Sequence, residues 1–385
     1  SRSRISHPTR YGSAPRLSGR WPMPERALSA RGLEAIAIGA GILGTGGGGN
    51  VYVAKLWIRE LLAHGGTIRI VDLADVADDA LVIACGGIGA PTVSYEKLRR
   101  GDEEARAVEA LAAMVGRPVD AVVSVEVGGA NAMRPMAVAA LAGVPVVDAD
   151  GMGRAFPELQ MVTFHIYGVP ATPATLADDK GNVARWDAPM DPLALERAAR
   201  ARCVELGGTA GMAGPAMTGL ELRRTAIRGS LTLAERIGQA VLDARARKDD
   251  PIHAILGVAG GRVLLRGKIV DVERRTTAGF ARGSVRIAGT EDDEGRTLRI
   301  EFQNENLVAH LDGEVVAAVP DLITIVAGED AEPVSTELLR YGYRVAVLVL
   351  PAPALLTTPE ALAVVGPRAF GYDVDFAPVA SRRAG

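Results

Sequence analysis

Three short apolar runs decide the fold of this chain: LVIAC at 81–85, AVVSVEV at 121–127 and VPVV at 144–147. Each run is rich in β-branched residues and has the length of a buried strand. A similar run, TIRIVDL, precedes them at 67–73, and sequence with helical periodicity lies between them at 103–115 and 130–142. Strands that alternate with helices predict a mainly parallel sheet covered by helices on both faces, which is an α/β fold.

The sequence changes character after this region. Residues 191–206 and 233–246 have helical spacing, and the second stretch opens on Thr232-x-x-Glu235, a capping-box pattern. From about residue 254, β-branched runs separated by turn signals predict strands, at 262–272, 283–287, 297–302, 307–311 and 345–350. We therefore predict an α/β N-terminal domain over 26–190 and a β-rich, mostly antiparallel C-terminal domain over 191–385, with helices at its start.

Composition excludes several classes of protein. The 385 residues carry a net charge of only −3, so no strong field attracts nucleic acid or an acidic membrane surface. The two cysteines have neither a disulfide framework nor zinc spacing, and no apolar run is long enough to span a bilayer. Residues 1–25 contain five arginines and no apolar core of a secretion signal, which predicts a disordered basic leader. We expect a soluble cytoplasmic protein that forms a homo-oligomer.

A glycine-rich loop, GTGGGGN at 44–50, separates two stretches with helical periodicity, one that starts at Leu33 and one at 51–63. The spacing Gly39-x-Gly41-x-x-Gly44 matches the dinucleotide fingerprint. That motif needs a strand ahead of it and a helix through its last glycine, whereas here the preceding residues have helical spacing and a run of four glycines follows. The Lys-Ser/Thr pair of a phosphate-binding P-loop is also missing. We therefore expect no nicotinamide cofactor.

The backbone of this loop suggests what it does instead. Consecutive glycines leave N–H groups bare at the start of the next helix, where an anion or a carbonyl oxygen can bind. The alternative is a tight turn that lets two helices pack, but one or two glycines suffice for that, and every glycine has an entropic cost. The sequence therefore predicts substrate-binding residues in the loop: Gly46, Gly47, Gly48, Gly49 and Asn50.

Polar residues follow the predicted strands at the edge where ligands bind in an open parallel sheet. Three acids are the candidate catalytic residues: Glu126, Asp148 and Asp150. Nearby glycines and polar side chains are further candidate substrate-binding residues: Gly128, Gly129, Asn131 and Arg154. These turns combine polar groups with glycines that let a ligand approach the backbone.

Each of these side chains has a second interpretation. Glu126 stands in an apolar run, so it works as a base, caps a helix, or is paired with Arg134 or Arg154. Asp148 and Asp150 have strand spacing and point to one side; they could bind a divalent cation, position a water or hold ligand N–H groups, or else cap a following turn.

Three other residues have less specific surroundings. Asn131 stands at a predicted helix start, where it caps the helix or contacts the ligand. His165 lies in an apolar run with no second histidine at metal spacing, which favours a core residue. Cys85 ends a strand beside two glycines; a buried thiol is usually inert, and a nucleophile is the alternative.

Several segments in the same order resemble the S-methyl thiohydantoin desulfurase family, over about residues 27–380. The matching segments are LGTGGGGN (43–50), GGIGAPTVSYEK (86–97), SVEVGGANAMRP (124–135), DADGMGRAFPELQM (148–161), GTAGMA (208–213), FQNENLVA (302–309), VPDLI (319–323) and VGPRAFGYD (365–373). The resemblance implies a two-domain protein that hydrolyses an S-methylated thiohydantoin to a hydantoin and methanethiol. It also implies a hydantoinase- or oxoprolinase-like protein in the same metabolism.

This reaction assigns roles to the candidate residues. A carboxylate, Glu126, Asp148 or Asp150, would deprotonate water, while N–H groups of the glycine loop and the Gly128-Gly129 turn would stabilise the developing charge. A divalent metal on Asp148 and Asp150 would instead supply hydroxide. The rival hypothesis is a non-catalytic subunit that binds a hydantoin-like ligand for a partner enzyme, and it needs the pocket but no base.

Overall fold

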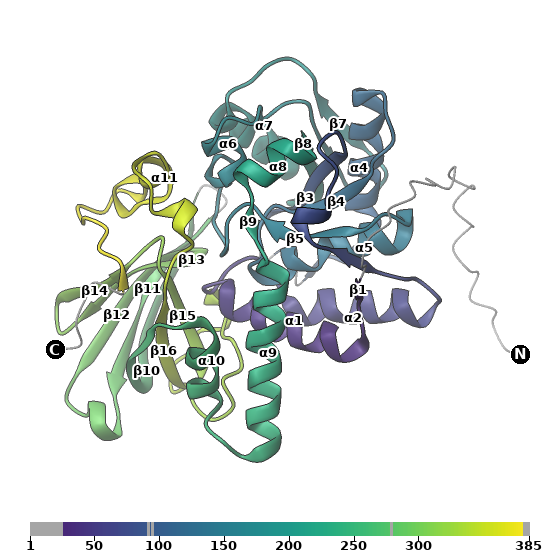
Figure 1. Ribbon diagram of the computed structural model, residues 1–385. Coiled ribbons are helices and arrows are strands. Elements are labelled where there is room, and N and C mark those ends of the chain that lie inside the picture. The colour runs from purple at the N-terminus through teal and green to yellow at the C-terminus, as the bar shows by residue number, and fades with distance from the viewer. Residues whose placement is uncertain (1–25, 91–92, 94–95, 278–279, 380–385) are drawn as a thin grey trace, which may run out of the picture.

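Two sheets organise the chain, as the computed structural model in Figure 1 shows. The structure describes residues 26–90, 93, 96–277 and 280–379. The predicted basic leader lies outside the described residues. One sheet is mixed and has nine strands, and the other has seven strands, all antiparallel. The predicted class, an α/β domain joined to a β-rich domain, is therefore confirmed.

The first sheet has a parallel centre with antiparallel additions. Its strands lie in the order β1 (Arg26–Ala27), β2 (Arg69–Val71), β5 (Val146–Asp150), β4 (Ala121–Ser124), β3 (Leu81–Gly89), β8 (Thr209–Thr218), β6 (Ala174–Ala177) and β7 (Val183–Trp186), and β9 (Ile227–Arg228) pairs with β5. The pairs β2–β5, β5–β4 and β4–β3 are parallel. Strands β8 and β9 come from the chain beyond residue 190, so the predicted C-terminal segment contributes to the first sheet.

The second sheet is formed by the strands predicted after residue 254 and two that were not predicted, β14 and β15. Its order is β14 (Glu314–Ala318), β13 (Glu305–Leu311), β12 (Thr297–Gln303), β11 (Phe280–Gly289), β10 (Arg262–Thr277), β16 (Arg344–Leu350) and β15 (Leu322–Ala327). Alternate residues such as Ile300 and Val347 are buried in one apolar cluster, which gives this sheet its core.

Helices surround the first sheet and separate it from the second (Figure 1). The longer ones are α1 (Ala30–Leu43), α2 (Val51–Ala63), α4 (Glu103–Val115), α5 (Arg134–Ala142), α7 (Pro192–Glu205), α9 (Ser230–Arg247) and α10 (Pro251–Ala259). Helices α2 and α4 have the predicted bounds. The capping box predicted at Thr232 is wrong, because α9 begins two residues earlier with Gly229 as its N-cap, and Glu235 pairs with Arg26 instead.

The closest helix contact joins α1 to α9. A β-carbon on Gly39 would overlap with the backbone carbonyl of Ala234, and a β-carbon on Gly238 would overlap with that of Ala35. The two helices therefore cross backbone to backbone, and only glycine fits at either crossing point. This contact explains Gly39, the first glycine of the fingerprint-like spacing: it lies inside a helix, not in a strand-to-helix turn.

We expect Gly39→Ala to lower the free energy of unfolding by about 1–3 kcal/mol or more, because the added methyl group forces α1 away from α9. Gly257→Ala in α10 is the matched control, since a β-carbon there meets no atom within 4 Å. Alanine should stabilise that helix by about 0.5–1 kcal/mol. Urea unfolding of both variants measures the difference, and equal effects would contradict the close crossing.

Candidate functional site

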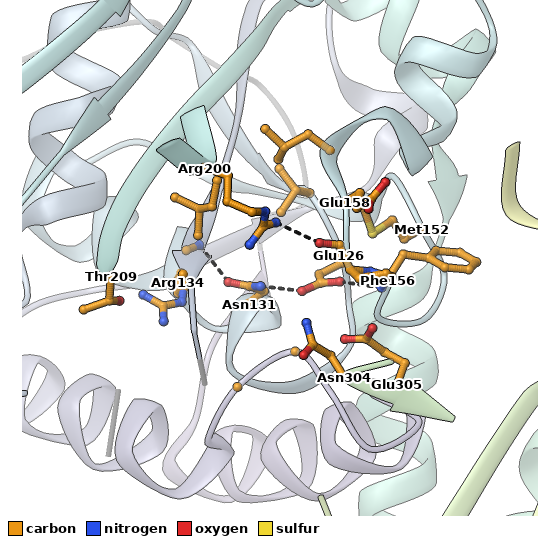
Figure 2. Close-up of a pocket in the computed structure, with 18 residues that line it drawn as sticks. Glu126, Asn131, Arg134, Met152, Phe156, Glu158, Arg200, Thr209, Asn304 and Glu305 are labelled. Carbon is orange, nitrogen blue, oxygen red and sulfur yellow. Dashed lines mark hydrogen bonds between the residues drawn. The ribbon is translucent and has the colours of Figure 1, made fainter. Parts of the chain in front are cut away.

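A small cavity opens where strands β3, β4 and β5 end and the second sheet approaches. Its volume is about 90 Å³. The N-terminal residues that line it include Gly48, Gly49, Gly87, Glu126, Asn131, Arg134 and Phe156, and the second sheet supplies Asn304 and Glu305. Arg200 of α7 and Thr209 of β8 complete another side. Figure 2 shows these side chains converging from both parts of the protein.

Glu126 is the predicted acid that faces this cavity. It follows the end of β4 and is only 5% exposed. The Asn131 amide donates a hydrogen bond to Oε1, and the Phe156 backbone N–H donates to Oε2 over 3.0 Å. Burial raises the pKa of Glu126 to about 8, although these two hydrogen bonds act to lower it. The carboxyl can therefore gain or lose a proton near neutral pH.

Asn131 positions Glu126. Its side-chain Oδ1 accepts a hydrogen bond from the Gly87 N–H over 2.8 Å, so its Nδ2 must point at the acid (Figure 2). Its backbone N–H donates to the Gly48 carbonyl over 3.3 Å. One residue thus ties the end of β3, the acid after β4 and the glycine loop together. The sequence left a cap or a ligand contact open for Asn131. Its side chain is not the N-cap of the helical turn that contains it, and the ligand contact stays a prediction, since Asn131 lines the cavity.

Glu305 is an acid that the sequence analysis missed. It begins β13, is 3% exposed, and approaches the cavity from a different side than Asn131 (Figure 2). Among the described residues, no donor reaches its Oε2. Burial raises the pKa of Glu305 well above its usual range, the charge of Glu126 raises it further, and the charge of Arg154 opposes both. The two carboxyls are therefore close enough to influence each other's ionisation.

The carbonyl groups of the glycine loop accept the hydrogen bonds that hold it in place. Asn306 N–H donates to the Thr45 carbonyl over 2.8 Å, and Thr336 N–H donates to the Gly46 carbonyl over 2.9 Å. These bonds attach the loop to the C-terminal part of the chain. Gly48 and Gly49 line the cavity, and no described residue accepts a hydrogen bond from either N–H. These two N–H groups match the predicted donors.

The other predicted glycines have packing roles. Gly46 contacts the side chain of Thr336, and Gly47 lies against the Glu305 carboxyl, where a β-carbon would overlap with it. A β-carbon on Gly48 would overlap with the Gly128 carbonyl, and one on Gly129 would overlap with the Gly48 backbone. The glycine loop and the Gly128-Gly129 turn therefore meet directly, and the absence of a β-carbon at Gly48 and Gly129 permits that contact.

Asn50 is a helix cap that does not line the cavity. Its Oδ1 accepts hydrogen bonds from the N–H groups of Tyr52, over 2.9 Å, and Val53, over 3.4 Å, at the start of α2. These bonds satisfy donors that the first turn of a helix otherwise leaves free.

Asp148 and Asp150 also bond to backbone N–H groups, and neither lines the cavity. Asp148 Oδ1 accepts from the N–H groups of Leu231, over 2.8 Å, and Thr232, over 3.1 Å, at the start of α9. The negative charge of the aspartate suits this end of the helix dipole.

Asp150 is fully buried, and burial raises its pKa to about 6. Its Oδ2 accepts from three N–H groups, those of Val127, Met152 and Gly153, over 2.7–3.0 Å. It therefore ties the turn after Glu126 to the turn that follows β5. Within the described residues, no group of three or more His, Cys, Asp or Glu side chains is arranged to hold a metal.

Arg154 does not point a free guanidinium at a substrate, because its N–H groups bond to the protein. It is fully buried and donates to the carbonyls of Ala155, Pro320, Asp321 and Asn306 and to the Thr45 hydroxyl over 2.8–3.4 Å. Burial lowers its pKa to about 10, while the charges of Glu305, Asp321 and Glu126 raise it. Arg154 therefore joins the glycine loop to the C-terminal part of the chain.

His165 is partly buried and Cys85 is fully buried, and neither lines the cavity. The His165 ring bonds through Nδ1 to the Val169 carbonyl over 3.1 Å, and burial lowers its pKa. Cys85 is fully buried in β3, and burial raises the pKa of its thiol well above its usual range. A thiol in this state is a poor nucleophile.

Comparison with known proteins identifies the family. A model described as S-Me-THD-like, N-terminal domain matches residues 31–188, and one described as S-Me-THD-like, C-terminal domain matches residues 190–379. The chain belongs to the S-Me-THD-like family, which confirms the resemblance found in its sequence and is consistent with a desulfurase-type role at family level.

One solved structure supports the fold. The crystal structure of a protein from Chromobacterium violaceum is similar, with a TM-score of 0.77 and 27% sequence identity, over 92% of this chain and 100% of that chain. No protein of curated function matches the chain. None of the described helices has both the length and the apolarity that a membrane span needs.

We expect Arg154→Met to lower the free energy of unfolding by about 3–5 kcal/mol, because several buried acceptors lose their donor. Arg154→Lys should also destabilise the protein, since an ammonium group cannot reproduce the planar fork of donors. Arg286→Lys, in an exposed pair with Asp271, is the control and should change stability by less than about 1 kcal/mol. Chemical denaturation tests all three; a stable Arg154→Met protein would refute the assigned role.

The pKa of Glu126 predicts a pH-dependent contribution to stability. Its folded value, about 8, lies above the ordinary value of 4.5, so between these pH values the folded state holds a proton that the unfolded state has released. We expect wild type to lose stability relative to Glu126→Gln as pH rises through this window, by on the order of a few kcal/mol. Unfolding curves at several pH values measure this, and a constant difference would indicate an unshifted carboxyl.

Proposed function

We propose that this protein hydrolyses the C–S bond of an S-methyl thiohydantoin-like ring, releasing methanethiol and leaving a hydantoin. One observation carries the proposal: two buried carboxyls, Glu126 and Glu305, reach the same small cavity from different parts of the fold, and the charge of Glu126 raises the pKa of Glu305. Paired acids with shifted pKa values are typical of acid–base catalysis. The family assignment supports the choice of substrate class.

The surroundings of the two acids favour different roles. Glu126 accepts two hydrogen bonds from N–H donors, which favour its ionised form, whereas no described donor reaches Oε2 of Glu305. We therefore assign Glu126 as the general base and Glu305 as the general acid. In the reactive state Glu126 is ionised, which requires loss of the proton that it holds below about pH 8, and Glu305 carries a proton.

The reaction balances with these two groups and one water. Water attacks the ring carbon that bears the S-methyl group; its proton passes to Glu126, and Glu305 gives a proton to the ring nitrogen as the C=N double bond opens. The tetrahedral intermediate then expels sulfur, which takes the proton from Glu126 and leaves as methanethiol. The new hydroxyl group returns its proton to Glu305 as the ring carbonyl forms, so both acids regain their starting states.

Backbone donors can stabilise the intermediate. The free N–H groups of Gly48 and Gly49 line the same cavity and are suited to developing negative charge on a ring oxygen or nitrogen. The loop's bonds to Asn306, Ala130 and Asn131 hold these backbone donors in place, so they need no reorganisation during the reaction. The hydantoin product also suggests a hydantoinase-like enzyme as the next step.

We expect Glu126→Gln and Glu305→Gln each to lower kcat at least about 100-fold, since each removes a proton-transfer group. Asp148→Asn is the matched control: its side chain caps α9, so it should cost about 1 kcal/mol of stability and leave turnover near that of wild type. Thiol release from an S-methyl thiohydantoin, followed with a thiol reagent, measures all three.

The same assay separates the proposal from its rivals. Near-normal rates for both glutamine variants would overturn the acid–base assignment. A purified wild-type protein that releases no thiol until a hydantoinase-like protein is added would instead identify a non-catalytic subunit. If methanethiol release required an added divalent metal, a metal-bound water would be the nucleophile in place of a water activated by Glu126.

A further inference from the structure

We propose that a second, apolar cavity beside the first one binds an apolar substituent on the substrate ring, so that the preferred substrates are thiohydantoins related to apolar amino acids. This inference rests on the proposed function and adds a substrate class to it. The cavity is bounded by α2, η2 (Gly129–Ala132), α5 and the segment at 97–101. Its volume is about 330 Å³.

The two cavities are neighbours. Gly49 and Arg134 line both of them, and adjacent residues of one short helix face opposite ways, with Ala130 lining the second cavity and Asn131 lining the first. A ring held beside Glu126 lies on one side of Gly49 and Arg134, and a substituent that extends between these two residues would reach the second cavity.

Apolar side chains dominate the wall of the second cavity. Helix α2 supplies four of them, the segment at 97–101 supplies one, and α5 with the residue before it supplies two. They are Val53, Ala54, Trp57, Ile58, Leu98, Met133 and Ala137. Trp57 satisfies its own polar atom by donating from Nε1 to the Gly101 carbonyl over 3.2 Å. Val53 and Leu98 are 53% and 94% exposed, which is a high exposure for two aliphatic residues in one patch. An apolar occupant would bury this surface.

The charged groups around this cavity are already paired. Glu104 bonds to both Arg99 and Arg134, and Lys97 pairs with Asp179 over 2.6 Å. A charged substituent would have to compete with these ion pairs, whereas an apolar one leaves them intact. The chemistry of the wall therefore selects against acidic and basic substituents.

The volumes of the two cavities suit different parts of the substrate. About 90 Å³ suits a small ring, and about 330 Å³ lies within the range of ordinary ligand pockets. On the other side of the first cavity, past Glu158 and Arg200, the surface opens onto a groove whose lining also includes the charged residues Glu196 and Arg197. Leu193, Val204 and Phe280 also line that groove, so a loss of preference in variants of the second cavity is what places the substituent there.

The test compares two substrates of the full-length protein: an unsubstituted S-methyl thiohydantoin and one with an isobutyl group on the ring. We expect wild type to prefer the isobutyl substrate about tenfold or more in kcat/KM. Ala54→Phe fills the apolar cavity and should reduce this ratio to about twofold or less. Val53→Glu, at a half-exposed position that tolerates a polar residue, should reduce the ratio as well and serves if Ala54→Phe does not fold.

Tyr52→Ala is the matched control on the same helix, since Tyr52 is 60% exposed and does not line the cavity. It should keep the wild-type ratio. Turnover of both substrates by wild type without preference would overturn the apolar subsite and leave the proposed function standing. Turnover of neither would overturn the proposed function and the subsite with it. A changed oligomeric state in Val53→Glu, with an unchanged ratio, would assign the patch to a second copy of the chain.

Discussion

The guanidinium of Arg154 is a fully buried positive charge, placed where the two sheets meet. Burial of such a group is costly unless every donor is satisfied, and here the glycine loop, β13 and the turn before β15 supply the acceptors. The position of the glycine loop relative to Glu305 follows from this requirement. Any displacement of the second sheet from the first would leave buried donors unpaired, so the cavity has a fixed shape.

That rigidity has an electrostatic consequence for the acids. Burial favours the protonated form of both Glu126 and Glu305, and the neighbouring guanidinium partly offsets it for each of them. Because Asn131 and the Phe156 N–H bond only to Glu126, the two carboxyls differ although their burial is similar. A symmetrical pair would share its protons equally, whereas this pair has one member that releases its proton more readily.

Local sequence patterns were enough for the longer helices other than α10 and for one acid, but not for the rest of the site. Helices α2 and α4 match their predicted bounds because their periodicity and stop signals are local. Strand β8, which reads TAGMAGPAMT, is poor in β-branched residues and becomes a strand through its pairing with β3 and β6. Glu305 follows Asn304, whose φ of 58° marks a tight turn, and an acid there looks like a solvated turn residue until β13 is placed against the first sheet.

The contact between α1 and α9 bears on how this chain can be divided. The two family models meet between residues 188 and 190, yet α9 lies after that boundary and packs on α1, which lies before it. Strand β8, also from the second segment, stands between β3 and β6 in the middle of the first sheet. Cutting the chain at the boundary would remove an interior strand and a covering helix from one half. The two family segments are therefore not independent folding units. We expect neither half to fold when it is expressed alone or fused to another protein.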